Sequence, residues 1–137
     1  EENALKTLNS GLSRIIISMD GTNQDTYEKY RIGGSMQKVI DGIENLVAAK
    51  KALKKTNPYI ILQFIVFKHN THQIADVKRL AKQLKVDKLE LKSAQVYDFE
   101  RGSDLIPEES GFSRYKLNGN DTYKIKNDLL NKCWKMF

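Results

Sequence analysis

RIIISMDG, residues 14–21, predicts a short β-strand that ends in a tight turn. Its three consecutive isoleucines place apolar side chains on both faces of the strand, and Asp20-Gly21 is a common turn pair. Strands that are apolar on both faces are typical of parallel sheets, whose faces are covered by other elements. The segment therefore predicts an α/β fold.

Two helices are predicted directly after this strand. Residues 22–30 predict a short helix capped by Thr22, and Gly33-Gly34 ends it. Ser35 is placed to cap a long helix. The apolar residues of that helix recur at intervals of three and four, which predicts one buried stripe: Met36, Val39, Ile40, Ile43, Leu46 and Val47.

Two further strands flank a third helix. Asn57-Pro58 ends the long helix and opens a strand at residues 59–67. Asn70 or Thr71 is expected to cap the next helix, and residues 88–94 predict the last strand. The order is β-α-β-α-β. Strands joined through whole helices lie parallel, so the sequence predicts a parallel sheet.

The length of the chain is compatible with two versions of this fold. A complete (β/α)₈ barrel needs about 250 residues, and the chain has 137. The chain is therefore expected to form either a small open α/β sheet or part of an incomplete (β/α) barrel. A partial barrel would expose a strand edge and apolar surface, so we expect self-association through that open edge.

The pattern changes near residue 97. The segment that follows is turn-rich, with a brief strand predicted at 123–125 and a helical turn at 127–134. We expect 1–96 to form the α/β part and 97–137 to form a loop-rich connection. A loop of this length is usually functional or disordered.

Composition indicates an intracellular protein. The single cysteine excludes an internal disulfide framework, and the first residues lack the basic and apolar regions of a signal peptide. The longest apolar run, at 59–67, is too short to cross a bilayer. A cytoplasmic location with no membrane partner is expected.

The net charge of +6 makes polyanions possible partners. Lysines at one helix end supply much of it: Lys50, Lys51, Lys54 and Lys55. Cations complement the negative end of a helix dipole, and no nucleic-acid-binding motif accompanies them. A solvated face is therefore favoured, and nucleic acid is not expected as a partner.

Polar residues interrupt the predicted strands. Ser18 and Asp20 share one face of the first strand, Gln63 lies in the second, and Glu90 and Lys92 lie in the third. Ligands of such sheets bind at the carboxyl ends of the strands, which would explain these residues. Alternatively, Ser18 and Gln63 satisfy each other and Lys92 reaches solvent.

The order of several motifs resembles the middle of a radical SAM enzyme barrel. The matching segments are ISMDG at 17–21, TYEKYR at 26–31, Gly33-Gly34, QFIVFKHN at 63–70 and LKSAQ at 91–95. In that family a strand ends in serine before Asp-Gly, a short helix ends in arginine, and a glycine turn opens the next helix. The resemblance implies that the chain is part of a (β/α) barrel.

The tail resembles the entry to a SPASM extension, a C-terminal module whose cysteines hold auxiliary iron–sulfur clusters. The matching segment is NKCW at 131–134. The resemblance implies that Cys133 ligates an auxiliary cluster as a thiolate in a full-length parent. It also implies that 97–137 leads into a truncated SPASM-type region.

The resemblance also implies roles for residues on the strands. Ser18 would hydrogen-bond the ribose or methionyl part of S-adenosylmethionine, and Arg31 would pair with its carboxylate. Gln63 would line the adenosyl side. Lys92 and Gln95 would face the substrate, which is unidentified and could be a peptide or protein. Arg31 alternatively only ends a helix, where a cation is favourable.

Parts of the family pattern are missing here. The CxxxCxxC loop that binds the catalytic [4Fe–4S] cluster is not in the sequence, nor are the other SPASM cysteines. We therefore expect a fragment of a radical SAM oxidoreductase, with no catalytic residue of its own. Its parent would bind S-adenosylmethionine and [4Fe–4S] clusters, whereas the fragment alone would bind none and be inactive.

Two other functions remain open. One is a basic α/β domain that binds a phosphorylated or polyanionic ligand through its lysines. The other is a docking domain in which residues 97–126 form a surface for a protein partner.

Overall fold

The computed structural model describes residues 2–107 and 111–126. The helices are α1 (Glu2–Asn9), α2 (Gln24–Glu28), α3 (Met36–Ala52) and α4 (Ile74–Gln83), with a 3₁₀ helix, η1, at Lys68–Gln73. The strands are β1 (Arg14–Ser18), β2 (Tyr59–Val66), β3 (Lys88–Ser93), β4 (Tyr115–Leu117) and β5 (Tyr123–Ile125). The predicted β-α-β-α-β order is confirmed.

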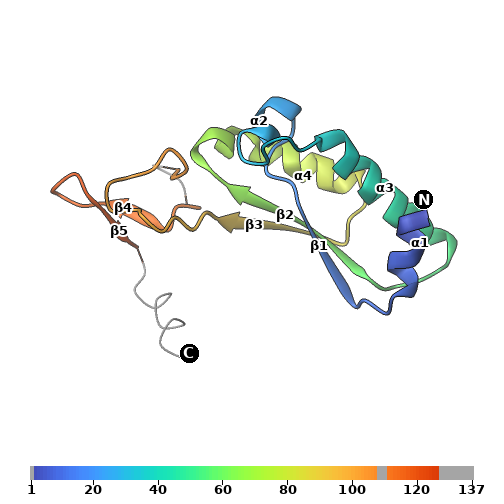
Figure 1. Cartoon of the computed structure of the whole chain (residues 1–137). Coiled ribbons are helices and arrows are strands. Elements are labelled where there is room, and N and C mark those ends of the chain that lie inside the picture. The colour runs from blue at the N-terminus through green and yellow to red at the C-terminus, as the bar shows by residue number, and fades with distance from the viewer. Residues whose placement is uncertain (1, 108–110, 127–137) are drawn as a thin grey trace.

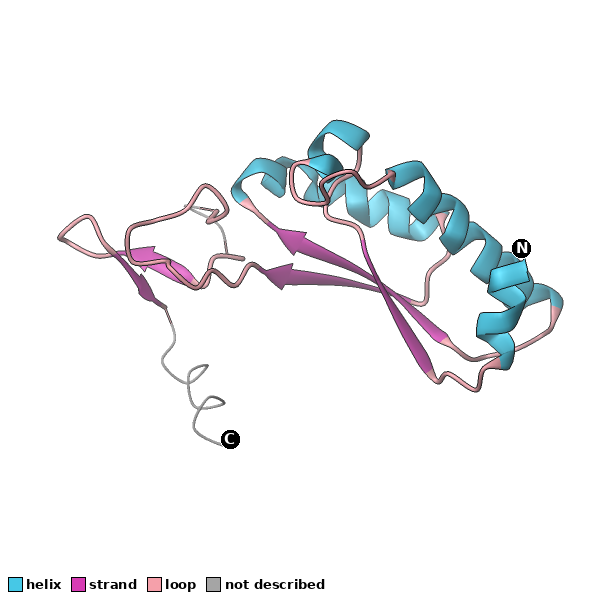
Figure 2. Cartoon of the chain, viewed as in Figure 1, coloured by secondary structure: helices cyan, strands magenta, loops and turns pink. Residues whose placement is uncertain are grey.

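The main sheet has three parallel strands in the order β1-β2-β3. Figures 1 and 2 show the helices lying along one face of this sheet, with the opposite face open in the described part of the chain. The strands form an open sheet rather than a closed barrel. The parallel α/β fold is thus confirmed, and its place in a larger barrel stays a prediction.

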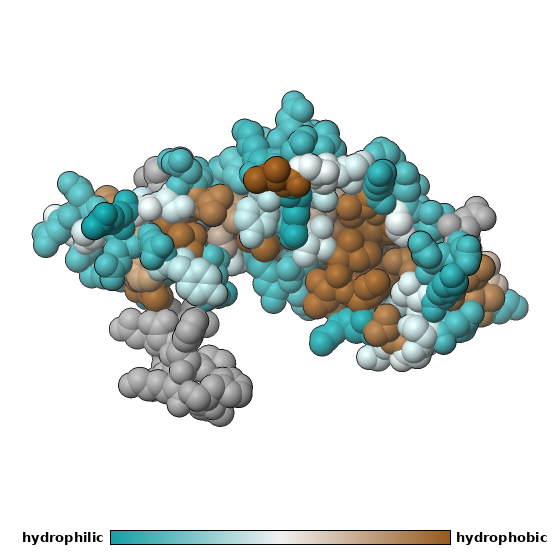
Figure 3. Space-filling model, viewed as in Figure 1, coloured by the Kyte–Doolittle hydropathy of each residue, from teal (hydrophilic) through white to brown (hydrophobic). Residues whose placement is uncertain are grey.

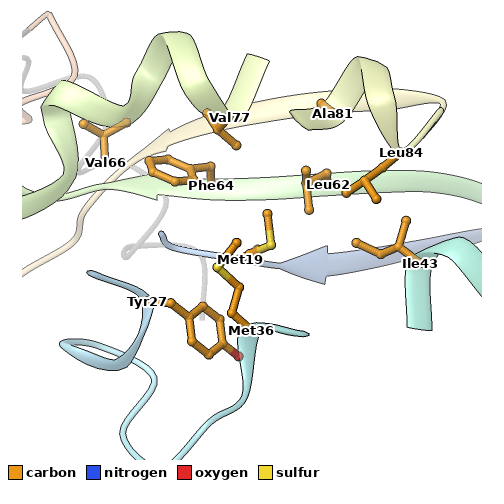
Figure 4. Close-up of a cluster of buried hydrophobic side chains, with 10 residues drawn as sticks. All are labelled: Met19, Tyr27, Met36, Ile43, Leu62, Phe64, Val66, Val77, Ala81 and Leu84. Atoms are coloured by element: carbon orange, nitrogen blue, oxygen red, sulfur yellow. The ribbon is translucent and has the colours of Figure 1, made fainter. Parts of the chain in front are cut away.

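The core lies between the sheet and the helices. Leu62, Phe64 and Val66 of β2 point toward α4 and α3 and are fully buried. Figure 4 shows how they meet the apolar stripes of the helices, and how Met19 fills the space beside α2. The remaining members of the cluster are Tyr27, Met36, Ile43, Val77, Ala81 and Leu84.

Of three predicted helix caps, two were wrong and one is confirmed. Asn23, not Thr22, caps α2, because its Oδ1 accepts from the Thr26 N–H at 2.9 Å. Neither Asn70 nor Thr71 caps α4, because η1 occupies those positions and α4 begins at Ile74. The cap at Ser35 is confirmed, since its Oγ accepts from Lys38 N at 3.3 Å.

Two elements were not predicted. Helix α1 packs against α3 through Ala4 and Leu8, its two buried residues. Strand β4 pairs antiparallel with β5, so residues 97–126 contain a small second sheet rather than only loop. The brief strand at 123–125 is confirmed as β5. The helical turn expected at 127–134 lies outside the described residues.

Strand β1 forms one edge of the sheet in the described chain. It pairs with β2, and Ile16 is 48% exposed although it lies mid-strand. In Figure 3 a large apolar area lies over β1 and beneath α3. Beside it, a cavity of about 440 Å³ opens between α1 and α3, lined in part by Ile17, Val39 and Leu46. The expected apolar strand edge is therefore present.

Candidate functional site

A row of polar side chains crosses the open face of the sheet. The register pairs Ser18 of β1 with Gln63 of β2, and Gln63 with Glu90 of β3. Residues paired across adjacent parallel strands point to the same side, so the three side chains lie next to one another. Gln63 Nε2 donates to Ser18 Oγ at 3.4 Å, and both residues are half-buried.

Two lysines flank the end of this row. Lys88 Nζ lies 2.7 Å from Glu90 Oε1, and Lys92 Nζ lies 3.5 Å from Glu90 Oε2. The hydrogen bond from Lys88 and the charges of both lysines lower the pKa of the Glu90 carboxyl. The row therefore ends in a carboxylate held between two cations.

A buried carboxylate closes the carboxyl end of the sheet. Asp20, two residues beyond Ser18, is completely buried. Its Oδ2 accepts from Arg31 Nε at 2.8 Å and pairs with Arg31 Nη2 at 2.7 Å, while its Oδ1 accepts from Ile65 N at 2.8 Å. Two N–H groups of the guanidinium fork are thus directed at Asp20, and the Arg31 side chain remains 35% exposed.

Buried amide side chains complete this end of the sheet. Asn70 Nδ2 donates to the carbonyls of Asp20 and Ile65, each at 3.0 Å, and Asn70 Oδ1 accepts from Phe67 N at 2.8 Å. Gln73 Oε1 accepts from Thr22 N at 2.9 Å. These bonds satisfy backbone groups that the strands and helices leave unpaired. They hold the loop after β1 against η1.

An aromatic cluster lies next to Arg31. The guanidinium carbon of Arg31 is 5.3 Å from the centre of the Tyr30 ring, and the centres of the Tyr30 and Phe67 rings are 4.3 Å apart. Phe67 in turn stacks with His69 at 5.3 Å. Burial, followed by the positive charge of Lys29, lowers the pKa of His69, although Asp20 opposes the shift. His69 is therefore favoured in its neutral form.

The structure brings together part of the predicted site. Ser18 and Gln63 are in contact, as the alternative of mutual satisfaction expects, and both face the open side of the sheet. Arg31 lies near the end of the same strand, where it pairs with Asp20, two residues beyond Ser18. Lys92 pairs in register with Ile65 near the same end, with its side chain half exposed.

The other predicted residues are elsewhere. Gln95 lies beyond β3, where its Oε1 accepts from Arg114 Nη1 at 3.4 Å beside the small second sheet. Cys133 lies outside the described residues. Asn70 and Gln73 were not predicted as site residues. The sequence held one indication of their role, which is that two amide side chains lie close together in a segment expected to be helical.

No metal centre is found in the part of the chain that the structure describes, where no three His, Cys, Asp or Glu side chains group together. Iron–sulfur clusters are held mainly by cysteine thiolates, and Cys133, the one cysteine of the sequence, lies outside the described residues. In the same residues, none of the helices has both the length and the apolar character that crossing a bilayer requires. Comparisons of the chain with protein families, curated proteins and solved structures find no match.

Proposed function

We propose that this chain is the later part of a radical SAM (β/α) barrel, in which the open face of the sheet lines the interior. The observation that supports this is the polar row Ser18–Gln63–Glu90 on the face away from the helices. Barrel sheets have helices on the outside and active sites at the carboxyl ends of the strands. The Asp20–Arg31 pair lies at that end of β1.

In this proposal the chain supplies one side of a binding site for S-adenosylmethionine. Ser18 Oγ and the Gln63 amide can exchange their weak mutual hydrogen bond of 3.4 Å for bonds to a polar ligand. Arg31 keeps Nε and Nη2 on Asp20, while the rest of its planar fork can bind a carboxylate. Lys92 and Gln95 would contact the substrate. The catalytic iron–sulfur cluster, held by cysteines outside this chain, would supply the electron that cleaves S-adenosylmethionine.

Iron content tests the proposal. We expect a longer protein that contains this chain and a CxxxCxxC loop to bind at least one [4Fe–4S] cluster after anaerobic reconstitution, and the chain alone to bind none. Iron and acid-labile sulfide are measured on both. In the longer protein, Cys133→Ser is expected to remove one auxiliary cluster and leave the cluster of the CxxxCxxC loop in place. A longer protein without iron would refute the proposal.

Self-association through β1 is a second expectation of the partial-barrel proposal. An exposed, apolar strand edge pairs with another edge, and here the partner is a second copy of the chain. Light scattering should show a mass above the monomer that rises with concentration. Ile16→Lys, on the exposed edge, should reduce it. The control Ile32→Lys changes an isoleucine that is 90% exposed and lies in the loop between α2 and α3. A strict monomer at high concentration would contradict this expectation.

A basic binding domain is the second candidate function. One observation favours it: the four lysines at the end of α3, residues 50, 51, 54 and 55, all line a single pocket. This pocket is at the amino-terminal end of the strands, near Ile60, and is therefore separate from the polar row. The two functions are not exclusive.

A further inference from the structure

Two helices end beside the same pocket, which we name the basic pocket. It has a volume of about 250 Å³. Lysines of the α3 end and of the turn between α4 and β3 surround it, and Val47 and Ile60 provide apolar contacts. Its charged lining residues are Lys50, Lys51, Lys54, Lys55, Lys85 and Asp87.

The basic pocket has a large excess of positive charge. Five lysines face one aspartate, which leaves a net charge of +4. The negative ends of α3 and α4 offset about one unit of this, since each helix terminus is equivalent to about half a charge. More positive charge is present than capping the two helices requires.

Asp87 neutralises only one of these lysines. Its Oδ2 accepts from Lys50 Nζ at 2.6 Å and from Ile60 N at 2.7 Å. Although burial alone would raise the pKa of Asp87, these hydrogen bonds lower it. Lys55 Nζ binds two neutral oxygens at the carboxyl end of α1, Leu8 O at 2.9 Å and Asn9 Oδ1 at 2.7 Å, so only the partial charge of that helix end offsets its own.

The remaining three lysines are exposed and form no ion pair within the described residues: Lys51, Lys54 and Lys85. Two of them have unusual backbone conformations. Lys54 has φ of +50° and Lys85 has φ of +55°, and each follows the C-cap of its helix. This left-handed position is normally glycine, which adopts it without steric penalty.

The helix ends themselves are regular. Lys54 N donates to Lys51 O at 3.1 Å and Lys55 N to Lys50 O at 3.0 Å, and Lys85 N donates to Lys82 O at 3.2 Å. Glycine at positions 54 and 85 would preserve these backbone bonds and relieve the conformation. The presence of lysine at both positions therefore adds charge to the pocket at the expense of backbone conformation.

From this arrangement we propose that the basic pocket binds a small oligophosphate, a molecule that carries two or three linked phosphate groups. Ammonium groups are favourable partners for phosphate oxygens, and five lysines line a pocket whose volume suits a compact polyanion. A nucleic acid is less suitable, because it needs an extended basic track and stacking side chains, and none of the residues that line this pocket is aromatic.

Titration calorimetry of the 137-residue chain with inorganic triphosphate tests this proposal. Binding should be strongest at low ionic strength and weaken as salt is raised, because exposed charges are screened. The double variant Lys54→Gly/Lys85→Gly should weaken binding about tenfold or more. Its melting temperature should equal or exceed that of the parent chain, so a loss of binding cannot be attributed to unfolding.

The matched control is Lys116→Gln/Lys124→Gln, which removes two exposed lysines from β4 and β5. It has the same net charge as the site variant and should bind within about twofold of the parent. The proposal is overturned if the parent chain does not bind triphosphate, if both double variants weaken equally, or if the site variant binds normally. Binding of a single-stranded oligonucleotide without binding of triphosphate would also overturn it. The proposal rests on the second candidate function, the basic binding domain, and none of these results depends on the radical SAM proposal.

Discussion

Replacing Arg31 with alanine is expected to lower the free energy of unfolding by about 3–5 kcal/mol. The variant would leave the fully buried carboxylate of Asp20 without its cation. The Ile65 N–H and the Asn70 amide would remain bound near Asp20, but neither carries a compensating charge. Urea denaturation followed by circular dichroism measures the loss.

A second arginine on the same molecule is the control. Arg79 pairs with Asp76 within α4, and both side chains are well exposed, at 70% and 45%. Exposed pairs of this kind contribute less than about 1 kcal/mol. Arg79→Ala should therefore change stability by about 0.5 kcal/mol or less. If Arg31→Ala were as mild as Arg79→Ala, the Asp20–Arg31 pair would not be a structural ion pair.

A double variant that removes both charged groups separates the effect of charge from that of hydrogen bonding at Asp20. Asp20→Asn/Arg31→Leu removes both charges while an amide oxygen can still accept from Ile65 N. Replacing both members of a buried pair is much less harmful than removing one. The double variant should therefore be more stable than Arg31→Ala, which would locate the loss in the unpaired carboxylate.

Much of the fold could be predicted because its signals are local. The isoleucine run at 15–17 and the three-and-four spacing in α3 need only neighbouring residues to be recognised. Helix α1 was not predicted because it is short and buries only Ala4 and Leu8, against a helix that begins only at Met36. Its stability depends on tertiary packing rather than on its own sequence.

Only part of the candidate site could be predicted from the sequence. Strand alternation placed Ser18 and Gln63 on polar faces, and the parallel register brings them together. The Asp20–Arg31 pair could not be predicted, because it depends on how α2 and the loop after it return to the end of β1. The prediction that Asn70 caps a helix was wrong for a related reason. Its type favours a helix cap, but tertiary contacts use its amide to bind the carbonyls of Asp20 and Ile65.

Gly21→Ala is expected to destabilise the chain by about 3 kcal/mol. A Cβ at this position would lie 2.3 Å from Tyr27 N, 2.6 Å from Tyr27 Cα and 2.9 Å from Thr26 C. These are backbone atoms of α2, so no side-chain rotation can make room. Accommodating the methyl group would push α2 away from β1. That shift would disturb both the buried Tyr27 ring and the loop to Arg31.

Gly42→Ala is the same substitution at another position, and there we expect it to stabilise the chain. Gly42 is exposed within α3, and a Cβ there would meet no atom within 4 Å. Alanine in the middle of a helix is favoured over glycine by about 0.5–1 kcal/mol, so this variant should be more stable than the parent chain. Thermal and urea unfolding should separate the two variants by about 3–4 kcal/mol. Equal stability would mean that α2 can move from the end of β1 without loss, and that the geometry around Arg31 is not fixed by this contact.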